Sequence, residues 1–528
     1  MKNEQMKKTM KGALILTLAA VTAKVLSALY RIPFQNIVGN TGFYVYQQIY
    51  PLYGIGMTLA LNGLPAFISK LVAQEDDEEK QAQVAARLFV LLAVLAVLLF
   101  GLLQLGAGLL SRLMGDPKLA SLITSVSWMF LLMPFLASAR GYGQGIFDMI
   151  PTALSQVSEQ MVRVGLIIGA ALAAQHLSWS VYQTGSVAML ASVLGGASAV
   201  LVLLPTLRKF LRYVPAKKAK ISYSLLLKAL FKEGAVLCLF AALMVLLQLV
   251  DSFTVLKSLQ DFGMSSQKAK FIKGIYDRGQ PLVQVGMTVA LSFSATLLPS
   301  LTATLKADKK EEFHEIAQTM LHSGIALATA ASAGLISLMP QVNLLLFGDS
   351  QLSLTLCIYI VSIPLISTLS ILNSILQSKG SFGGTWLAVI LTLAVKIFLN
   401  SWLISHIGIM GAALSTALGL VAGIAALTLI WPRNYREQGK RQRNFGIKLL
   451  LCVAAMMSVV FGAAWICQQL FQLGRLQVLI FVPCAVILGV LVFVLTATQT
   501  HLFTLAEWEA LPGGSKLVAK INHIKKHQ

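Results

Sequence analysis

Long apolar segments follow one another along almost the whole chain, and they constrain its fold more than any other feature. The hydrocarbon core of a bilayer is about 30 Å thick, so a helix needs about 20 mainly apolar residues to cross it. Segments of this length predict an all-α polytopic membrane protein with about 14 transmembrane helices. The expected spans lie at about 12–38, 41–69, 85–111, 120–143, 152–175, 181–207, 224–256, 275–304, 314–339, 351–377, 382–404, 409–432, 446–470 and 476–500.

The composition agrees with a membrane protein. Of the 528 residues, 56% are hydrophobic and 12% are charged, against roughly 25% charged in a soluble domain. The basic N-terminus and first apolar run are similar to a signal peptide, but the run continues to Val38, so we expect no cleavage. The five cysteines lack metal-ligand spacing, so we expect buried, reduced thiols without a disulfide or a metal site. They are Cys238, Cys357, Cys452, Cys467 and Cys484.

Basic residues are distributed unequally between the two sides of the predicted spans. The chain has 42 Lys and Arg against 21 Asp and Glu, which gives a formal net charge of +21. With the N-terminus inside, about thirty basic residues lie on the inner side and about seven on the outer side. This bias predicts that both termini are cytoplasmic and that the number of spans is even. The excess of basic residues is therefore expected to orient the protein and to contact anionic lipid head groups, and not to bind nucleic acid.

Spans two and eight share a sequence pattern. Residues 51–61 (PLYGIGMTLAL) and 281–291 (PLVQVGMTVAL) match at Pro, Gly, Met and Thr. Six spans separate the two, so both halves have the same orientation, as in transporters that rock two bundles around a central site. The predicted domains are an N-lobe at 1–212, a C-lobe at 213–443, two added spans at 444–500 and a cytoplasmic tail at 501–528.

Several basic residues lie deep within the predicted spans. A charged side chain there costs about 2.5–3.5 kcal/mol, so it is normally paired, near a span end or in a wet cavity. Glu159 and Arg163 have the i,i+4 spacing of an intrahelical ion pair. Arg31 and Arg278 lie nearer the outer ends of their spans and can snorkel towards that surface. The alternative is a cationic cavity for an anionic, oxygen-rich ligand such as pyrophosphate. That cavity would be lined by Lys24, Arg31, Arg163 and Arg278.

Tyrosines recur at helical spacing on span two. Tyr46, Tyr50 and Tyr53 follow an i, i+4, i+7 pattern and therefore share one helix face. One interpretation is an interfacial aromatic belt with helix packing. The other is a wall on which Tyr46 and Tyr50 stack against a sugar.

An aspartate in span seven has no basic partner one turn away. Asp251 is therefore either an ordinary helix-end residue or a site for a cation or a proton. Lys396 and Asn400, one turn apart on span eleven, are expected neighbours.

Three segments resemble the signatures of one transporter family. The first is KVLSALYRIP at 24–33; the second begins YDR at 276–278 and ends LPS at 298–300; the third is KIFLN at 396–400, followed by GAALST at 411–416. They are similar to the polysaccharide-transporter branch of the multidrug/oligosaccharidyl-lipid/polysaccharide flippase superfamily. The likeness covers essentially the whole chain. It points to the stage V sporulation protein B group of Gram-positive bacteria, with lipid II flippases as a neighbouring group.

This resemblance implies a flippase of the cytoplasmic membrane that exports an undecaprenyl-pyrophosphate-linked oligosaccharide, or a peptidoglycan or polysaccharide precursor, by alternating access. It places cavity-facing cations at Arg278 and at Arg31 or Lys24. The chain lacks the span-two Arg of lipid II flippases, which argues against identical specificity. Coupling to sodium, to protons or to the membrane potential is implied. The residues implied in ion coupling are Asp251, Asn400 and Thr416, with the Lys396 ammonium where an ion would sit.

Two other functions are weighed against this one. A multidrug cation antiporter of the same superfamily would need carboxylates in its cavity instead of cations. A membrane glycosyltransferase or polymerase would need a sizeable outer loop with acids or His, and the longest outer connection, at about 257–274, offers Asp261 and no His. We therefore expect a monomeric transporter and not an enzyme, with no cofactor. Its expected partners are a lipid-linked sugar and membrane lipids, without nucleic acid.

Overall fold

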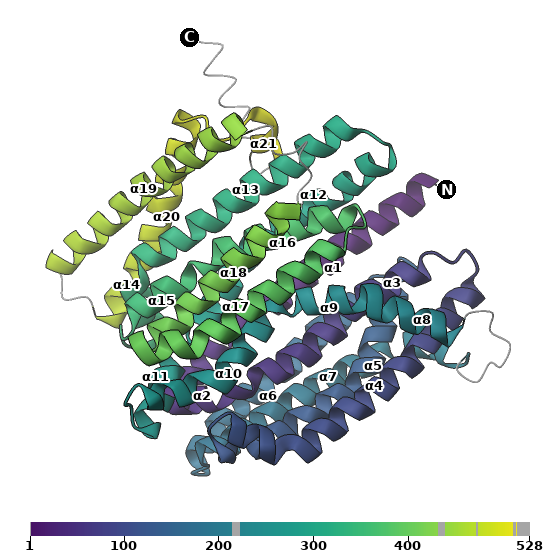
Figure 1. Cartoon of the computed structure of the whole chain (residues 1–528), viewed down its shortest axis with the longest axis horizontal. Helices are drawn as coiled ribbons and strands as arrows, with labels where there is room; N and C mark the ends of the chain where they lie inside the picture. Colours follow the sequence, from purple (N-terminus) through teal and green to yellow (C-terminus); the bar gives the residue numbers. More distant parts are fainter. Residues whose placement is uncertain (1, 214–221, 431–438, 471–473, 511–513, 515–528) are drawn as a thin grey trace, which may run out of the picture. The chain divides into compact units, whose positions relative to one another are not determined.

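The computed structural model describes residues 2–213, 222–430, 439–470, 474–510 and 514. Within these residues the chain forms helices and no strand (Figure 1). Helices satisfy every backbone hydrogen bond within one segment, which a chain surrounded by lipid requires. The all-α prediction is confirmed.

The chain packs as two compact units. Unit 1 comprises Met1–Asp277 and Lys396–Ala412, and unit 2 comprises Arg278–Val395 and Ala413–Gln528. These units follow side-chain packing, whereas the predicted lobes at 1–212 and 213–443 follow the internal repeat. The lobe boundaries therefore stay a prediction.

Unit 1 contains the first fourteen helical elements. They are α1 (Lys2–Leu29), α2 (Arg31–Thr58), the π-helical turn η1 (Leu59–Gly63), α3 (Leu64–Val72), α4 (Glu78–Leu113), η2 (Pro117–Leu119), α5 (Ala120–Gly145), α6 (Ile150–His176), α7 (Val181–Leu211), α8 (Tyr223–Ala229), η3 (Leu230–Gly234), α9 (Ala235–Ala241), α10 (Leu243–Asp261) and α11 (Ser266–Tyr276).

Most later helices belong to unit 2, except that α17 passes into unit 1 at Lys396 and α18 leaves it after Ala412. They are α12 (Gly279–Lys306), α13 (Lys310–Ser337), α14 (Met339–Phe347), α15 (Ser353–Ile360), α16 (Ser362–Ser378), α17 (Gly383–Ile407), α18 (Met410–Ile430), α19 (Gly439–Leu470), α20 (Arg475–Gln499) and α21 (Leu505–Ala510).

Twelve helical segments among the described residues are long and apolar enough to cross a membrane. The first, Leu18–Val72, has 55 residues, and at 1.5 Å per residue its length is about 80 Å, more than two bilayer cores. Helix α2 kinks at Gly39, where φ is 73° and ψ is 179°, a conformation that glycine adopts readily. This kink permits the two crossings predicted at 12–38 and 41–69. The predicted total of fourteen is not confirmed.

Close packing of α7 on α6 positions the polar residues of unit 1. A Cβ atom at Gly195 of α7 would lie 2.8 Å from both the Arg163 Cβ and the Glu159 carbonyl oxygen of α6. A glycine is therefore needed for the two helices to approach this closely. The approach brings Ser192, one turn before Gly195, against the Arg163 side chain.

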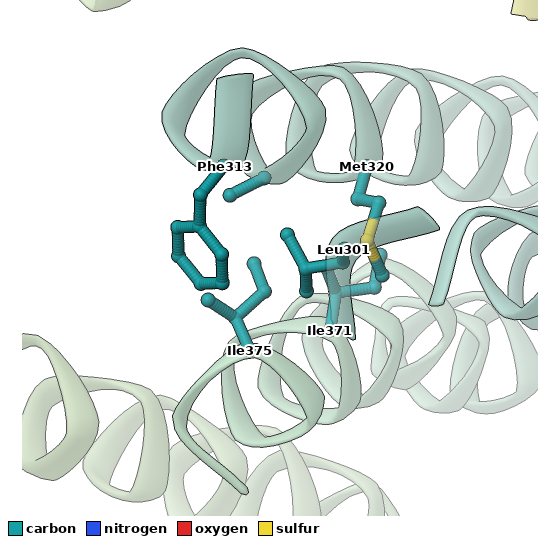
Figure 2. Close-up of a cluster of buried hydrophobic side chains, with 6 residues drawn as sticks. Leu301, Phe313, Met320, Ile371 and Ile375 are labelled. Atoms are coloured by element: carbon teal, nitrogen blue, oxygen red, sulfur yellow. The ribbon is translucent and has the colours of Figure 1, made fainter. Parts of the chain in front are cut away.

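A cluster of apolar side chains joins three helices of unit 2 (Figure 2). Side chains from α12, α13 and α16 meet there and are almost completely buried, so their removal from water or lipid fixes the spacing of the three helices. The cluster comprises Leu301, Phe313, Ala317, Met320, Ile371 and Ile375.

All five cysteines are free thiols. Cys238 and Cys452 are buried, Cys357 and Cys467 are half-buried, and Cys484 is exposed on α20, so full burial is confirmed for the first two only. The prediction of burial is wrong for Cys484 because an outward-facing side chain of a membrane helix is covered by lipid and not by protein.

The topology can be tested at a loop that the positive-inside bias places outside. In a cysteine-free background, we expect a cysteine at the exposed Ser350 to react with an impermeant maleimide added to intact cells. A cysteine at the exposed Gln74, in the predicted inner loop, is the matched control and should react only after lysis. The reverse pattern would refute the orientation.

Candidate functional site

Arg163 of α6 lies at the centre of a buried polar network in unit 1. Its Nη2 atom donates hydrogen bonds to the hydroxyls of Tyr30 and Tyr46, at 2.8 and 3.1 Å. Its Nε and Nη1 atoms donate to Ser192 Oγ and Gln160 Oε1, at 3.1 and 3.2 Å. All four acceptors are neutral, so these bonds orient the guanidinium without cancelling its charge.

Arg31, the first residue of α2, is a second buried guanidinium. Its side chain is 1% exposed, and its Cζ atom lies 4.0 Å from the centroid of the Tyr50 ring. The ring face attracts the cation, and side-chain hydrogen bonds link Arg31 to the neutral hydroxyls of Tyr50 and Tyr30. Among the described residues, the Arg31 Nε and Nη2 atoms have no hydrogen-bond partner. The snorkelling alternative is wrong for Arg31 because its side chain is enclosed by protein.

The tyrosines of α2 form a wall beside these two cations. The ring centroids of Tyr46 and Tyr50 are 6.2 Å apart, and those of Tyr50 and Tyr53 are 5.6 Å apart. Arg163 Cζ lies 4.1 Å from the Tyr53 ring centroid. These rings are buried within unit 1, which agrees with the helix packing of the first interpretation but not with its interfacial belt. The sugar-stacking wall stays a prediction. We call this set the cation–tyrosine cluster: Arg31, Arg163, Tyr30, Tyr46, Tyr50 and Tyr53.

The predicted ion pair between Glu159 and Arg163 is wrong. Glu159 Oε2 lies 2.7 Å from Arg140 Nη2, and both side chains are completely buried. Helical spacing correctly places Glu159 near Arg163, but it cannot reveal a competing partner on another helix. Arg140 lies near the predicted inner end of a span, where the orientation rule alone accounts for an Arg, so the sequence does not predict its contact with Glu159.

The other two predicted cavity cations have different surroundings. Lys24 is exposed on α1, in contrast to Arg31. Arg278 belongs to unit 2, where its Nη1 and Nη2 atoms each lie 2.8 Å from an oxygen of Asp349. A cavity shared by Lys24, Arg31, Arg163 and Arg278 therefore stays a prediction.

Asp349 and Asn343 hold Arg278 near the C-terminal end of α14. Asn343 Oδ1 accepts a hydrogen bond of 3.1 Å from Arg278 Nη1, and its amide donates to the Gln351 carbonyl. Partial burial would raise the pKa of the Asp349 carboxyl, but hydrogen bonds from Arg278 and the Gln351 backbone N–H outweigh it. The pKa of Asp349 therefore lies below its ordinary value. Arg475 of α20 caps α14 by donating to two of its last carbonyls.

The expected neighbours of Asp251 are confirmed in unit 1. Lys396 Nζ lies 2.7 Å from Asp251 Oδ1, and Asn400 Nδ2 donates to the same oxygen at 3.0 Å. The Lys396 ammonium also donates to Asn400 Oδ1 at 3.1 Å and to the Ala412 carbonyl at 2.9 Å. Three oxygens thus surround one buried ammonium. Thr416 belongs to unit 2, and its part in ion coupling stays a prediction.

Lys270, Asp116 and Tyr182 form a polar cluster in unit 1 that the sequence analysis does not predict. Lys270 Nζ of α11 lies 2.7 Å from Asp116 Oδ2 and 3.0 Å from the Tyr182 hydroxyl. Partial burial would lower the pKa of Lys270, but the hydrogen bonds to Asp116 and Tyr182 raise it. Asp116 and Asp349 both lie in the connection after the third predicted span of their half. A search for acids at repeat-related positions would have found them.

The apolar helices define a multi-pass membrane protein, and charged side chains buried within its spans are typical of the transporter class. The family model described as polysaccharide biosynthesis protein matches residues 9–305. The chain is also 36% identical over 511 residues to the uncharacterized membrane protein YabM of Bacillus subtilis (strain 168), covering 96% of this chain and 95% of that protein. The chain therefore belongs to this polysaccharide biosynthesis family.

Two relatives of Bacillus subtilis (strain 168) have functional names. The lipid II flippase MurJ is 25% identical over 513 residues, which cover 91% of this chain and 93% of the flippase. Stage V sporulation protein B is 29% identical over 198 residues, which cover 37% of this chain and 38% of the relative. These names confirm the predicted superfamily and favour a membrane flippase or transporter over an enzyme.

Solved structures of the same superfamily share the fold. A lipid II flippase MurJ in an inward closed conformation has a TM-score of 0.68 at 13% identity and covers 92% of this chain and 98% of its own. An inward-facing multidrug resistance transporter has a TM-score of 0.60 at 16% identity, and the match covers 81% of this chain and 99% of the transporter. The chain is therefore a multi-pass protein of the cytoplasmic membrane with a flippase-like fold.

The lowered pKa of Asp349 generates a pH-dependent prediction. Stability from a lowered carboxyl pKa is present above the ordinary value of about 3.9 and is lost as the pH falls through the folded-state pKa. We expect Asp349→Asn to lower the free energy of unfolding by about 1–2 kcal/mol at neutral pH. Melting of the purified protein should show the full difference above about pH 5, and the difference should shrink as the pH falls below about 4 towards the folded-state pKa of Asp349. A difference that persists unchanged at pH 3 would contradict the assignment.

Proposed function

We propose that the protein exports an undecaprenyl-pyrophosphate-linked oligosaccharide, or another peptidoglycan or polysaccharide precursor on such a carrier, by alternating access. The observation that carries this proposal is the charge of the cation–tyrosine cluster. Arg31 and Arg163 are buried, and neither forms a salt bridge among the described residues. Two unneutralised cations in a low-dielectric interior are costly unless an anion binds there during the working cycle.

The chemistry of the cluster suits pyrophosphate. Guanidinium groups bind phosphate oxygens with two parallel N–H donors, and Arg31 retains donors on Nε and Nη2 for this purpose. The Tyr30 and Tyr46 hydroxyls, 2.8 Å apart, offer further polar atoms beside Arg163. A pyrophosphate has enough oxygens to bridge both guanidinium groups.

The tyrosine wall suits the sugar next to the pyrophosphate. An aromatic ring presents a flat apolar face and, in tyrosine, a hydroxyl that can form hydrogen bonds. Tyr50 retains 8% exposure, more than the other three tyrosines of the cluster, and is the ring that we assign to this contact. Opening of the site during alternating access would expose it further.

The relatives support a lipid-linked substrate but leave its head group open. The name of the lipid II flippase indicates a lipid-linked peptidoglycan precursor for that protein. This chain lacks the span-two Arg that the resemblance places in the cavity of lipid II flippases, so we propose a different head group. The fold is shared with multidrug transporters, but buried cations are a poor site for cationic drugs.

We propose that Lys396 takes the place of a free coupling cation. Its ammonium is bound by a carboxylate, an amide oxygen and a backbone carbonyl, which are the oxygen types that bind sodium and other hard cations. A sodium ion at the same oxygens would require Lys396 to leave. Protons or the membrane potential are therefore the coupling sources that this arrangement favours over sodium.

The anion site is tested by removing its cations. We expect Arg31→Ala and Arg163→Ala each to reduce flipping at least about tenfold, because each removes a charged donor worth about 1.5–3 kcal/mol. The measurement is head-group exposure in vesicles that contain undecaprenyl-pyrophosphate-linked sugars. Arg112→Ala removes the same charge from an exposed position and should keep full activity. Normal flipping by both cluster variants would reject the site.

The coupling proposal is tested by vacating the ammonium position. We expect the wild-type protein to flip equally well in sodium and in N-methylglucamine buffers. Lys396→Ala leaves Asp251 and Asn400 without their cation, so we expect its remaining activity to depend on sodium. Sodium-dependent flipping by the wild type would refute the proposal. Asn400→Ala, which alters the same site but keeps the ammonium, is the control.

A further inference from the structure

A carboxylate lies one helical turn from Arg163 without binding it. Residues four apart on a helix have Cβ atoms about 5–6 Å apart, close enough for a Glu and an Arg side chain to meet. In a buried site the attraction between them would be strong. Glu159 nevertheless bonds to Arg140 of α5 at 2.7 Å, and Arg163 keeps only neutral partners.

Arg140 is fixed by three groups on two other elements. Its Nε donates to Ser155 Oγ at 3.1 Å, one turn before Glu159 on α6. Its Nη1 donates to the Ala60 carbonyl at 3.2 Å, within the π-helical turn η1 that continues α2. The guanidinium is completely buried, and these bonds leave it one orientation, in which Nη2 meets Glu159.

We propose that Arg140 is a positioning residue that keeps Glu159 away from Arg163. By binding the carboxylate, Arg140 preserves the net positive charge of the cation–tyrosine cluster for an anionic ligand. Its bond to Ala60 also fixes the tyrosine-bearing segment relative to α6. The inference rests on the proposed function, since it assumes that the cluster binds a phosphate-type anion.

A purely structural role would give a different pattern of variants. If Arg140 and Glu159 only join α5 to α6, loss of either charge leaves a buried partner unpaired and loss of both removes the link. If Arg140 keeps Glu159 away from Arg163, the two single variants should have different effects on the charge of Arg163. Arg140→Gln releases a carboxylate towards Arg163, whereas Glu159→Gln leaves no carboxylate to neutralise it.

The experiment measures binding of inorganic pyrophosphate to the full-length protein in detergent by calorimetry. We expect Arg140→Gln to weaken binding at least about tenfold, and Arg140→Gln with Glu159→Gln to return it to within about threefold of wild type. Glu159→Gln alone should bind like wild type. A double variant as weak as Arg140→Gln would overturn the inference, as would unchanged binding by Arg140→Gln.

A second variant tests the same idea without disturbing Arg140. Gln160 Oε1 already accepts a hydrogen bond from Arg163, so Gln160→Glu supplies a carboxylate of the same shape. We expect it to weaken pyrophosphate binding at least about tenfold while the protein melts like wild type. Wild-type binding by Gln160→Glu would overturn the inference even if Arg140→Gln fails to fold.

The outcomes separate the inference from the proposed function. If the wild-type protein binds no pyrophosphate, the anion site and the inference that rests on it are both rejected. If the wild type binds pyrophosphate but the rescue by Glu159→Gln is missing, only the inference is rejected.

Discussion

A buried guanidinium that has no carboxylate partner is the constraint on which unit 1 depends. Membrane interiors penalise charge, so proteins normally neutralise it locally. Around Arg163 the opposite is found: tyrosine hydroxyls, a serine and a glutamine orient the cation, while Arg140 binds the nearby carboxylate. The helices α2, α5, α6 and α7 all contribute to this arrangement, so their packing and the charge of the cluster depend on each other.

The two units treat buried charge differently. In unit 2, Arg278 is matched by both oxygens of Asp349, and the pair is supported by Asn343. In unit 1, Asp251 is matched by Lys396, but Arg31 and Arg163 are not matched. A buried cation that is bound by a carboxylate stabilises a fixed structure, whereas a buried cation without a carboxylate can bind an anionic ligand. By this contrast, the electrostatic attraction for an anion would be strongest at the cation–tyrosine cluster.

The sequence predicted the parts of the fold that depend on local pattern. Apolar length revealed the membrane helices, and glycine at position 39 marks the kink between the first two spans. Chemical complementarity correctly joined Asp251 to Lys396 although they are far apart in the chain. Spacing failed for Glu159, because helical periodicity describes one helix and its partner Arg140 lies on another. Arg140 gave no signal of its own, since an Arg near a span end is also what orientation requires.

Three of the roughly seven basic residues on the predicted outer side are bound by a carboxylate or by the carbonyls of a helix end. Lys270 binds Asp116, Lys273 binds Asp277 at 3.0 Å, and Arg475 caps the carbonyls of α14. A cation whose field is cancelled by a carboxylate or by a helix C-terminus exerts little pull towards either side of the membrane. These three cations can therefore lie on the predicted outer side without weakening the charge bias that orients the protein during insertion.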